Sequence, residues 1–129
     1  MIEIFEITEV DDFTLDAVNH LLPQLSQSAQ PISSGSLQDL ARSEATRLFM
    51  AKEGNAILGM LSLVVFAIPT GIKAWIEDVV VEEDARGKGV GKKLMMHAIA
   101  ETEKAGAKSI DLTSRPSREA ANQLYQSIG

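Results

Sequence analysis

The chain has 129 residues, no cysteine, 45% hydrophobic residues, 23% charged residues and a formal net charge of −6. This length predicts one domain over residues 1–129, and the lack of cysteine excludes a disulfide framework, a thiol nucleophile and a cysteine-based zinc site. The acidic amino terminus does not resemble a signal peptide, and an acidic chain lacks the basic face that nucleic acids need. We therefore expect a cytoplasmic protein without nucleic-acid or membrane partners.

Hydrophobic periodicity and capping residues predict alternating groups of strands and helices. The first half should begin with a strand at 2–10, followed by a helix that is capped by Asp11 or Asp12 and ends before residue 26, and by a short helix capped by Ser36. Three strands should follow at 47–52, 56–68 and 74–81. After them we expect a helix at 89–105 with Gly106 as its carboxyl-terminal cap, a strand at 109–113 and a helix capped by Ser117. The order β-α-α-β-β-β-α-β-α predicts an α+β fold, an α/β/α sandwich. Its first strands are antiparallel, and a βαβ crossover makes the last two parallel.

Glycines and basic residues are concentrated between the strand at 74–81 and the helix at 89–105. Residues 84–129 carry 8 Lys and Arg against 5 Asp and Glu, whereas residues 1–83 carry 4 against 13. The first turn of a helix leaves backbone N–H groups unpaired, and glycines let an anion approach them. This segment therefore predicts a pyrophosphate site, with a solvated run of charges as the alternative. The expected binding residues are Arg86, Gly87, Lys88, Gly89, Val90, Gly91 and Lys92.

The spacing of these glycines excludes two common phosphate-binding motifs. Both a Walker A loop and a Rossmann GxGxxG motif that start at Gly87 require a glycine where Lys92 stands. What remains is Arg-x-x-Gly-x-Gly, formed by Arg86, Gly89 and Gly91. Turn glycines with a purely structural role would give the same pattern.

In this context the chain resembles the GNAT N-acetyltransferase superfamily. Its loop, Arg/Gln-x-x-Gly-x-Gly/Ala, lies between the fourth strand and the helix that carries the cofactor pyrophosphate. The segment IEDVVVEEDARGKGVGKKL matches this core motif, and ANQLYQSIG matches a later helix more loosely. The resemblance implies a GNAT-like mixed sheet and direct transfer of an acetyl group from acetyl-CoA to a primary amine, without a metal. The acidic amino-terminal half favours a cationic small molecule as acceptor, although a protein amine would fit too.

The resemblance also implies candidate catalytic residues. Glu77 corresponds to a Glu that often acts as base. The alternatives are Asp78 as the base, a Glu77 that only binds the substrate, and a Glu77 that is an exposed structural carboxylate. Strand alternation predicts that these two side chains point to opposite faces. Tyr125 would donate a proton to the departing thiolate, since a phenol stays protonated at neutral pH, or it would pack as a core aromatic residue.

Further cofactor contacts follow from the same resemblance. Asn122 would bind the pantetheine or the phosphate arm, unless it is a surface amide. The backbone of Val79 and Val81 would meet the pantetheine amides, because the family separates this strand from the next and leaves main-chain groups unpaired.

The sequence stops at Gly129, before the last two strands of typical family members. We therefore expect an exposed edge at the strand at 109–113. Either a homodimer or higher assembly shields it, or the domain is weakened and its carboxyl-terminal helix is mobile. A non-catalytic acyl-CoA-binding regulatory or interaction domain is the alternative function.

Overall fold

The computed structural model describes residues 1–107 and 109–112 of the chain. Its elements follow the expected order. They are β1 (Glu3–Glu6), α1 (Asp12–Leu25), α2 (Ser34–Arg42), β2 (Thr46–Glu53), β3 (Ala56–Ile68), β4 (Gly71–Val81), the short 3-10 helix η1 (Glu83–Ala85), α3 (Val90–Lys104) and β5 (Ile110–Leu112). The helix expected from Ser117 lies outside the described residues.

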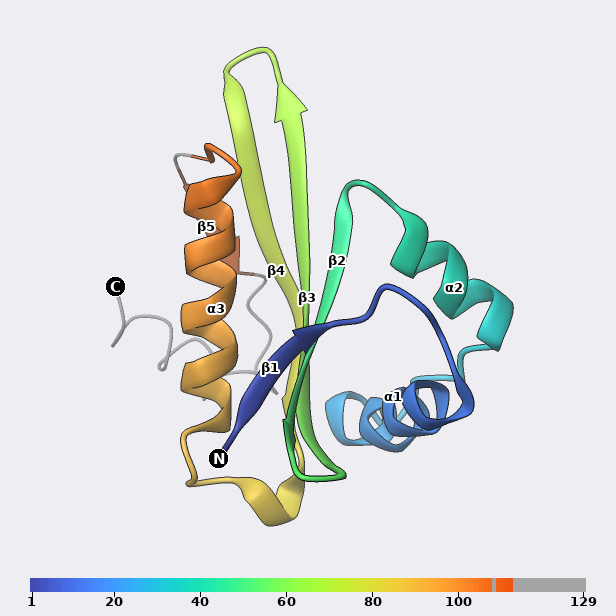
Figure 1. Cartoon of the computed structure of the whole chain (residues 1–129). Coiled ribbons are helices and arrows are strands. Elements are labelled where there is room, and N and C mark those ends of the chain that lie inside the picture. Colours follow the sequence, from blue (N-terminus) through green and yellow to red (C-terminus); the bar gives the residue numbers. More distant parts are fainter. Residues whose placement is uncertain (108, 113–129) are drawn as a thin grey trace.

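The strands form one mixed sheet in the order β1-β2-β3-β4-β5. Neighbours from β1 to β4 are antiparallel, and β4 pairs in parallel with β5. Helices α1 and α2 lie on one face of the sheet and α3 lies on the other, while the tip of the β3–β4 hairpin projects beyond the other elements (Figure 1). This arrangement confirms the predicted α+β class and the three-layer sandwich.

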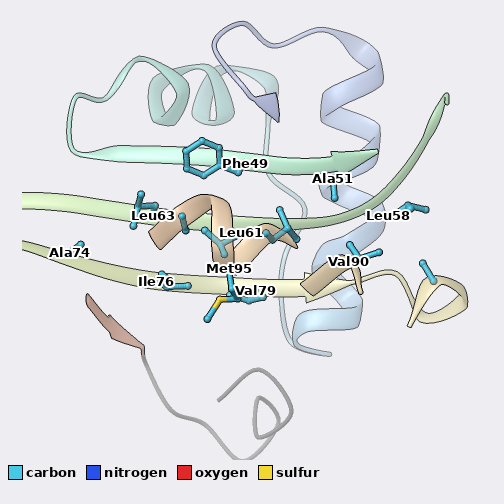
Figure 2. Packing of buried hydrophobic residues seen from close by; sticks show 13 residues of the cluster. Phe49, Ala51, Leu58, Leu61, Leu63, Ala74, Ile76, Val79, Val90 and Met95 are labelled. Carbon is cyan, nitrogen blue, oxygen red and sulfur yellow. The ribbon is translucent and has the colours of Figure 1, made fainter. Parts of the chain in front are cut away.

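Two apolar cores fill the spaces between these layers. On the α3 face, Phe49, Leu61 and Ile76 of the sheet pack with Leu94 and Met95 of the helix (Figure 2). A second core lies on the α1 and α2 face, where its buried residues are Ile7, Val18, Leu21, Leu37, Met50 and Val80. The sheet is therefore buried on both sides along its central strands.

Caps define the helix ends. The side chain of Asp11 accepts a hydrogen bond of 2.8 Å from the Thr14 backbone N–H and thus begins α1. At the end of α3, Gly106 has φ 83°, and a hydrogen bond runs from the Ala107 N–H to the Thr102 carbonyl. This Schellman motif confirms Gly106 as the terminating glycine.

Three boundaries differ from the prediction by more than one residue. Ser33, not Ser36, caps α2, because the Ser33 hydroxyl accepts from the Ser36 N–H. The first strand ends at Glu6, and further on the N–H of Val10 bonds to the Gln38 side chain instead of another strand. The fourth strand begins at Gly71, since its ladder with β3 continues to the hairpin turn.

None of the described helices is both long and apolar enough to cross a membrane.

Candidate active site

The glycine loop lies between η1 and α3 and has an open backbone. Gly87 and Gly89 have φ of 89° and 81°, a region that residues with a Cβ rarely adopt. A Cβ added to either glycine would have no atom within 4 Å. The conformation therefore requires glycine, and the space beside it is free for a ligand.

The amino terminus of α3 faces this loop without a side-chain cap. Gly89 is the capping residue and forms no side-chain hydrogen bond, so the N–H groups of Val90, Gly91 and Lys92 have no acceptor within the helix. The first turn holds no acidic residue, and the side chains of Lys92 and Lys93 are exposed. Helix dipole, free N–H groups and lysines thus present positive potential to an anion.

The end of β4 holds Arg86 beside the loop. The Arg86 side chain is exposed, and its Nε donates to the Val81 carbonyl at 3.3 Å. Its neighbour Lys88 is exposed as well. The fit of the loop to a pyrophosphate therefore rests on backbone N–H groups, with these cations as additional charge.

Close packing fixes the start of α3 against the sheet. Val90 is buried and packs against β3 at Gly59. A Cβ on Gly59 would stand 2.8 Å from the Val80 carbonyl oxygen and 3.2 Å from both Leu94 Cδ1 and Val90 Cγ1. Sequence reasoning missed Gly59, because a glycine inside a strand indicates close approach only in general terms.

Helix α1 holds the segment that enters the glycine loop. Gln24 Nε2 donates to Glu82 Oε2 at 2.9 Å, and Gln24 Oε1 accepts from the Glu83 N–H at 2.9 Å. His20 Nε2 lies 2.8 Å from the same Glu82 oxygen. This tether was not predicted, since no local pattern links residues so far apart in the sequence.

A β-bulge interrupts β4 at the candidate base. Met60 pairs with Val80 and Ser62 pairs with Glu77, so Leu61 stands opposite two residues, Asp78 and Val79. Asp78 has φ 52° and is the one described residue other than glycine with positive φ. The alternation that predicted opposite faces for Glu77 and Asp78 is therefore broken at this position.

A pocket of about 90 Å³ lies at this bulge, between the sheet and helices α1 and α2. Asp78 and Ser62 are part of its lining, and Glu77 is the strand partner of Ser62. The remaining lining residues are apolar: Ile7, Val18, Leu22, Ile32, Leu37, Leu40, Leu48, Phe49, Met60 and Leu61. The pocket combines an apolar interior with a carboxylate-bearing residue, and it was not apparent from the sequence.

Among the described residues, β5 pairs with the first part of β4. The described pairs are Ala74 with Ile110, Trp75 with Asp111 and Ile76 with Leu112. Val79 and Val81 lie beyond these pairs, and their side chains pack against the core on the α3 face. Their backbone contacts with a cofactor stay a prediction.

The structure does not describe two of the predicted site residues. Asn122 and Tyr125 lie outside the described residues, so their roles also stay predictions. Within residues 1–107 and 109–112, no three His, Asp or Glu side chains are grouped to hold a metal ion.

The family model of the acetyltransferase (GNAT) family matches residues 14–129. The chain belongs to the GNAT acetyltransferase family. No curated protein sequence matches it significantly.

Solved structures share the fold. An acetyltransferase of Trypanosoma brucei is 25% identical, with a TM-score of 0.81 over 100% of this chain and 92% of that one. A transcriptional regulator from Bacillus halodurans C-125 is 24% identical, with the same TM-score and coverage. An aminoglycoside acetyltransferase from an uncultured soil metagenomic sample, solved with sisomicin, is 21% identical, with a TM-score of 0.83 over 98% of this chain and 86% of that one.

Proposed function

We propose that this GNAT protein transfers the acetyl group of acetyl-CoA to the nitrogen of a primary amine, with both substrates bound at once. The observation that supports this most is the open glycine loop at the uncapped start of α3. Family membership supports acetyl transfer, while acetyl-CoA as donor and an amine as acceptor are the proposal's own additions.

The glycine loop would bind the pyrophosphate of CoA. The N–H groups of Val90, Gly91 and Lys92 point out of the first turn of α3, where negative charge is stabilised. The positive φ of Gly87 and Gly89 shapes the backbone without placing side chains in the way. Arg86 and Lys88 add charge-assisted contacts from the rim of the loop.

The second half of β4 would connect this loop to the reacting atoms. Val81 ends β4 next to the loop, and Asp78 stands three residues earlier in the strand. At about 3.3 Å per residue, the bulge lies about 10 Å from the end of the strand. The backbone of Val79 and Val81 would hold the extended pantetheine arm along this path.

Proton transfer would involve residues at the bulge and Tyr125. Acetyl-CoA supplies the activated acetyl group. As the new C–N bond forms and the C–S bond breaks, the amine nitrogen loses a proton, which Glu77, or Asp78 in its place, would accept. Tyr125 would give a proton to the sulfur of the departing thiolate.

An assay with a panel of amines tests the proposal. The protein is incubated with acetyl-CoA and single amines from different classes: alkyl amines, diamines, amino sugars, amino acids and peptides. Free CoA should appear only with an accepted amine, in amounts equal to the acetylated amine found by mass spectrometry. Tight CoA binding without turnover of any amine would contradict the proposal and favour an acyl-CoA-binding domain.

A further inference from the structure

The pocket at the β4 bulge has mostly apolar walls and two polar residues on its sheet side. Ten of the twelve described residues that line it are apolar, among them buried Leu37 of the core on the α1 and α2 face, whereas the side chains of Phe49 and Leu61 pack with α3 on the other face. Ser62 and Asp78 are the two polar lining residues, and both belong to the strands that flank the bulge. A ligand that fits would carry apolar atoms on one side and a polar, cationic group on the other.

Asp78 has an unfavourable backbone conformation, which distinguishes it from the other residues of β4. A residue with a Cβ at φ 52° is disfavoured, and such strain persists where the surrounding structure holds it in place. The bulge puts an extra residue between Glu77 and Val79, and that residue contributes to the pocket lining. A regular strand would continue the alternation past Glu77 and would leave Asp78 on the α3 face.

We propose that the acceptor is a primary amine with a short apolar substituent, which binds in this pocket while its ammonium group lies beside Asp78. This inference rests on the proposed function and names the class of its acceptor. A carboxylate attracts the ammonium group before the proton is lost, and the apolar walls bury the substituent.

The size and polarity of the pocket disfavour larger and more polar amines. Its volume of about 90 Å³ is smaller than the cavity of about 150 Å³ that admits benzene, so it fits a chain of a few carbon atoms. A second ammonium group or the hydroxyls of an amino sugar would lose water there without finding matching partners. Each buried methylene group, by contrast, should strengthen binding about fourfold.

A substitution at the opening of the pocket can be compared with a matched substitution on the other side of the sheet. Leu40 of α2 lines the pocket and is 38% exposed, so a polar substitution there spares the core. Met96 of α3 is 52% exposed and lies on the opposite side of the sheet. L40Q should therefore change amine preference, whereas M96Q makes a similar substitution at a distant surface.

Two measurements with isobutylamine, diaminobutane and ethanolamine test the inference. The first is the kcat/KM of each amine at saturating acetyl-CoA. We expect at least a tenfold preference of the wild type for isobutylamine, reduced at least threefold in L40Q and unchanged in M96Q. The second is the unfolding midpoint of the protein without CoA, which isobutylamine should raise by about 2 °C or more and diaminobutane should not.

The outcomes separate this inference from the proposed function. Turnover that favours diaminobutane or ethanolamine would overturn the inference and leave acetyl transfer intact. Absence of turnover with every amine would contradict the proposed function, and the unfolding midpoints would still decide whether the pocket selects an apolar amine. If L40Q does not fold, the amine series on the wild type decides alone.

Discussion

The side-chain oxygen of Gln24 accepts a hydrogen bond of 2.9 Å from the backbone N–H of Glu83, which lies 59 positions further along the chain. The amide nitrogen of the same side chain donates to Glu82 at 2.9 Å. One glutamine on α1 thus holds both residues that lead from β4 into the glycine loop. We infer that helix α1 contributes to the position of the CoA site without touching CoA.

Removal of this tether should weaken CoA binding. Q24A should lower the free energy of unfolding by about 1–2 kcal/mol and raise the Kd for CoA about threefold or more, since the loop loses a fixed position. Q38A is the matched control, because Gln38 accepts a similar hydrogen bond of 3.1 Å from the Val10 N–H far from the loop. Calorimetric titration should show unchanged CoA affinity for Q38A. Equal losses of affinity in both variants would mean that Gln24 acts only through global stability.

The close contacts of Gly59 with β4 and α3 predict a steric effect. G59A would place a methyl group 2.8 Å from the Val80 carbonyl oxygen, so we expect a loss of about 1–3 kcal/mol in the free energy of unfolding. G35A, in α2, meets no atom within 4 Å and should be neutral or stabilising by about 1 kcal/mol. Chemical denaturation compares the two variants. A neutral G59A would show that β3 can move away from Val80 and α3 at no cost.

Local patterns in the sequence were sufficient to predict most of the fold. Hydrophobic periodicity predicted the strands β2 and β3, because it is a local property of each segment. Capping chemistry limited the start of α1 to Asp11 or Asp12, of which Asp11 is the cap, and it predicted the end of α3 at Gly106. The glycine loop was predicted as a site because its position between strand and helix is itself a local property.

The parts that were missed depend on contacts between distant segments. The bulge at Asp78 is set by the pairing of β3 with β4, which simple alternation along one strand cannot reveal. The pocket needs α1 and α2 packed on the sheet, and the Gln24 tether joins segments separated by most of the chain. Tertiary packing, not local preference, determines these features.

An ionic cluster on the α3 side predicts a pH dependence of stability. Arg47 donates to Glu6 at 2.8 Å and to Glu101 at 3.1 Å, and Lys104 lies 3.5 Å from Glu101. Burial alone would raise the pKa of Glu101, but the hydrogen bonds and charges of Arg47 and Lys104 outweigh it and lower this pKa. A lowered folded-state pKa gives stability that is present above the unfolded-state value and lost as the pH falls through the folded-state value.

E101Q should therefore lose about 1–2 kcal/mol in the free energy of unfolding at neutral pH. Its difference from the wild type should begin to shrink as the pH falls through the ordinary Glu pKa of about 4.3, where the unfolded chain takes up a proton, and should vanish below the lowered folded-state pKa. E103Q, an exposed position on the same helix, is the control. Denaturation curves across this pH range measure the effect. A difference that stays constant with pH would contradict the ionic origin.

Substitutions at the bulge distinguish the two candidate bases. If Glu77 accepts the proton, E77Q should remove the acidic limb of the kcat/KM profile, while D78N keeps that limb and raises the KM of the amine. The opposite result would make Asp78 the base. Unchanged profiles in both variants would contradict a carboxylate base at the bulge.

The proposed function depends most on binding of the CoA pyrophosphate at the start of α3, and one titration tests this binding most directly. Gly91 and Gly35 are each the second residue of their helices, α3 and α2. Calorimetric titration of CoA into the wild type, G91E and G35E compares the same substitution at the proposed site and away from it. We expect G91E to raise the Kd at least tenfold, because its carboxylate occupies the place of the phosphates, and G35E to match the wild type. A folded G91E protein with wild-type affinity for CoA would contradict the account.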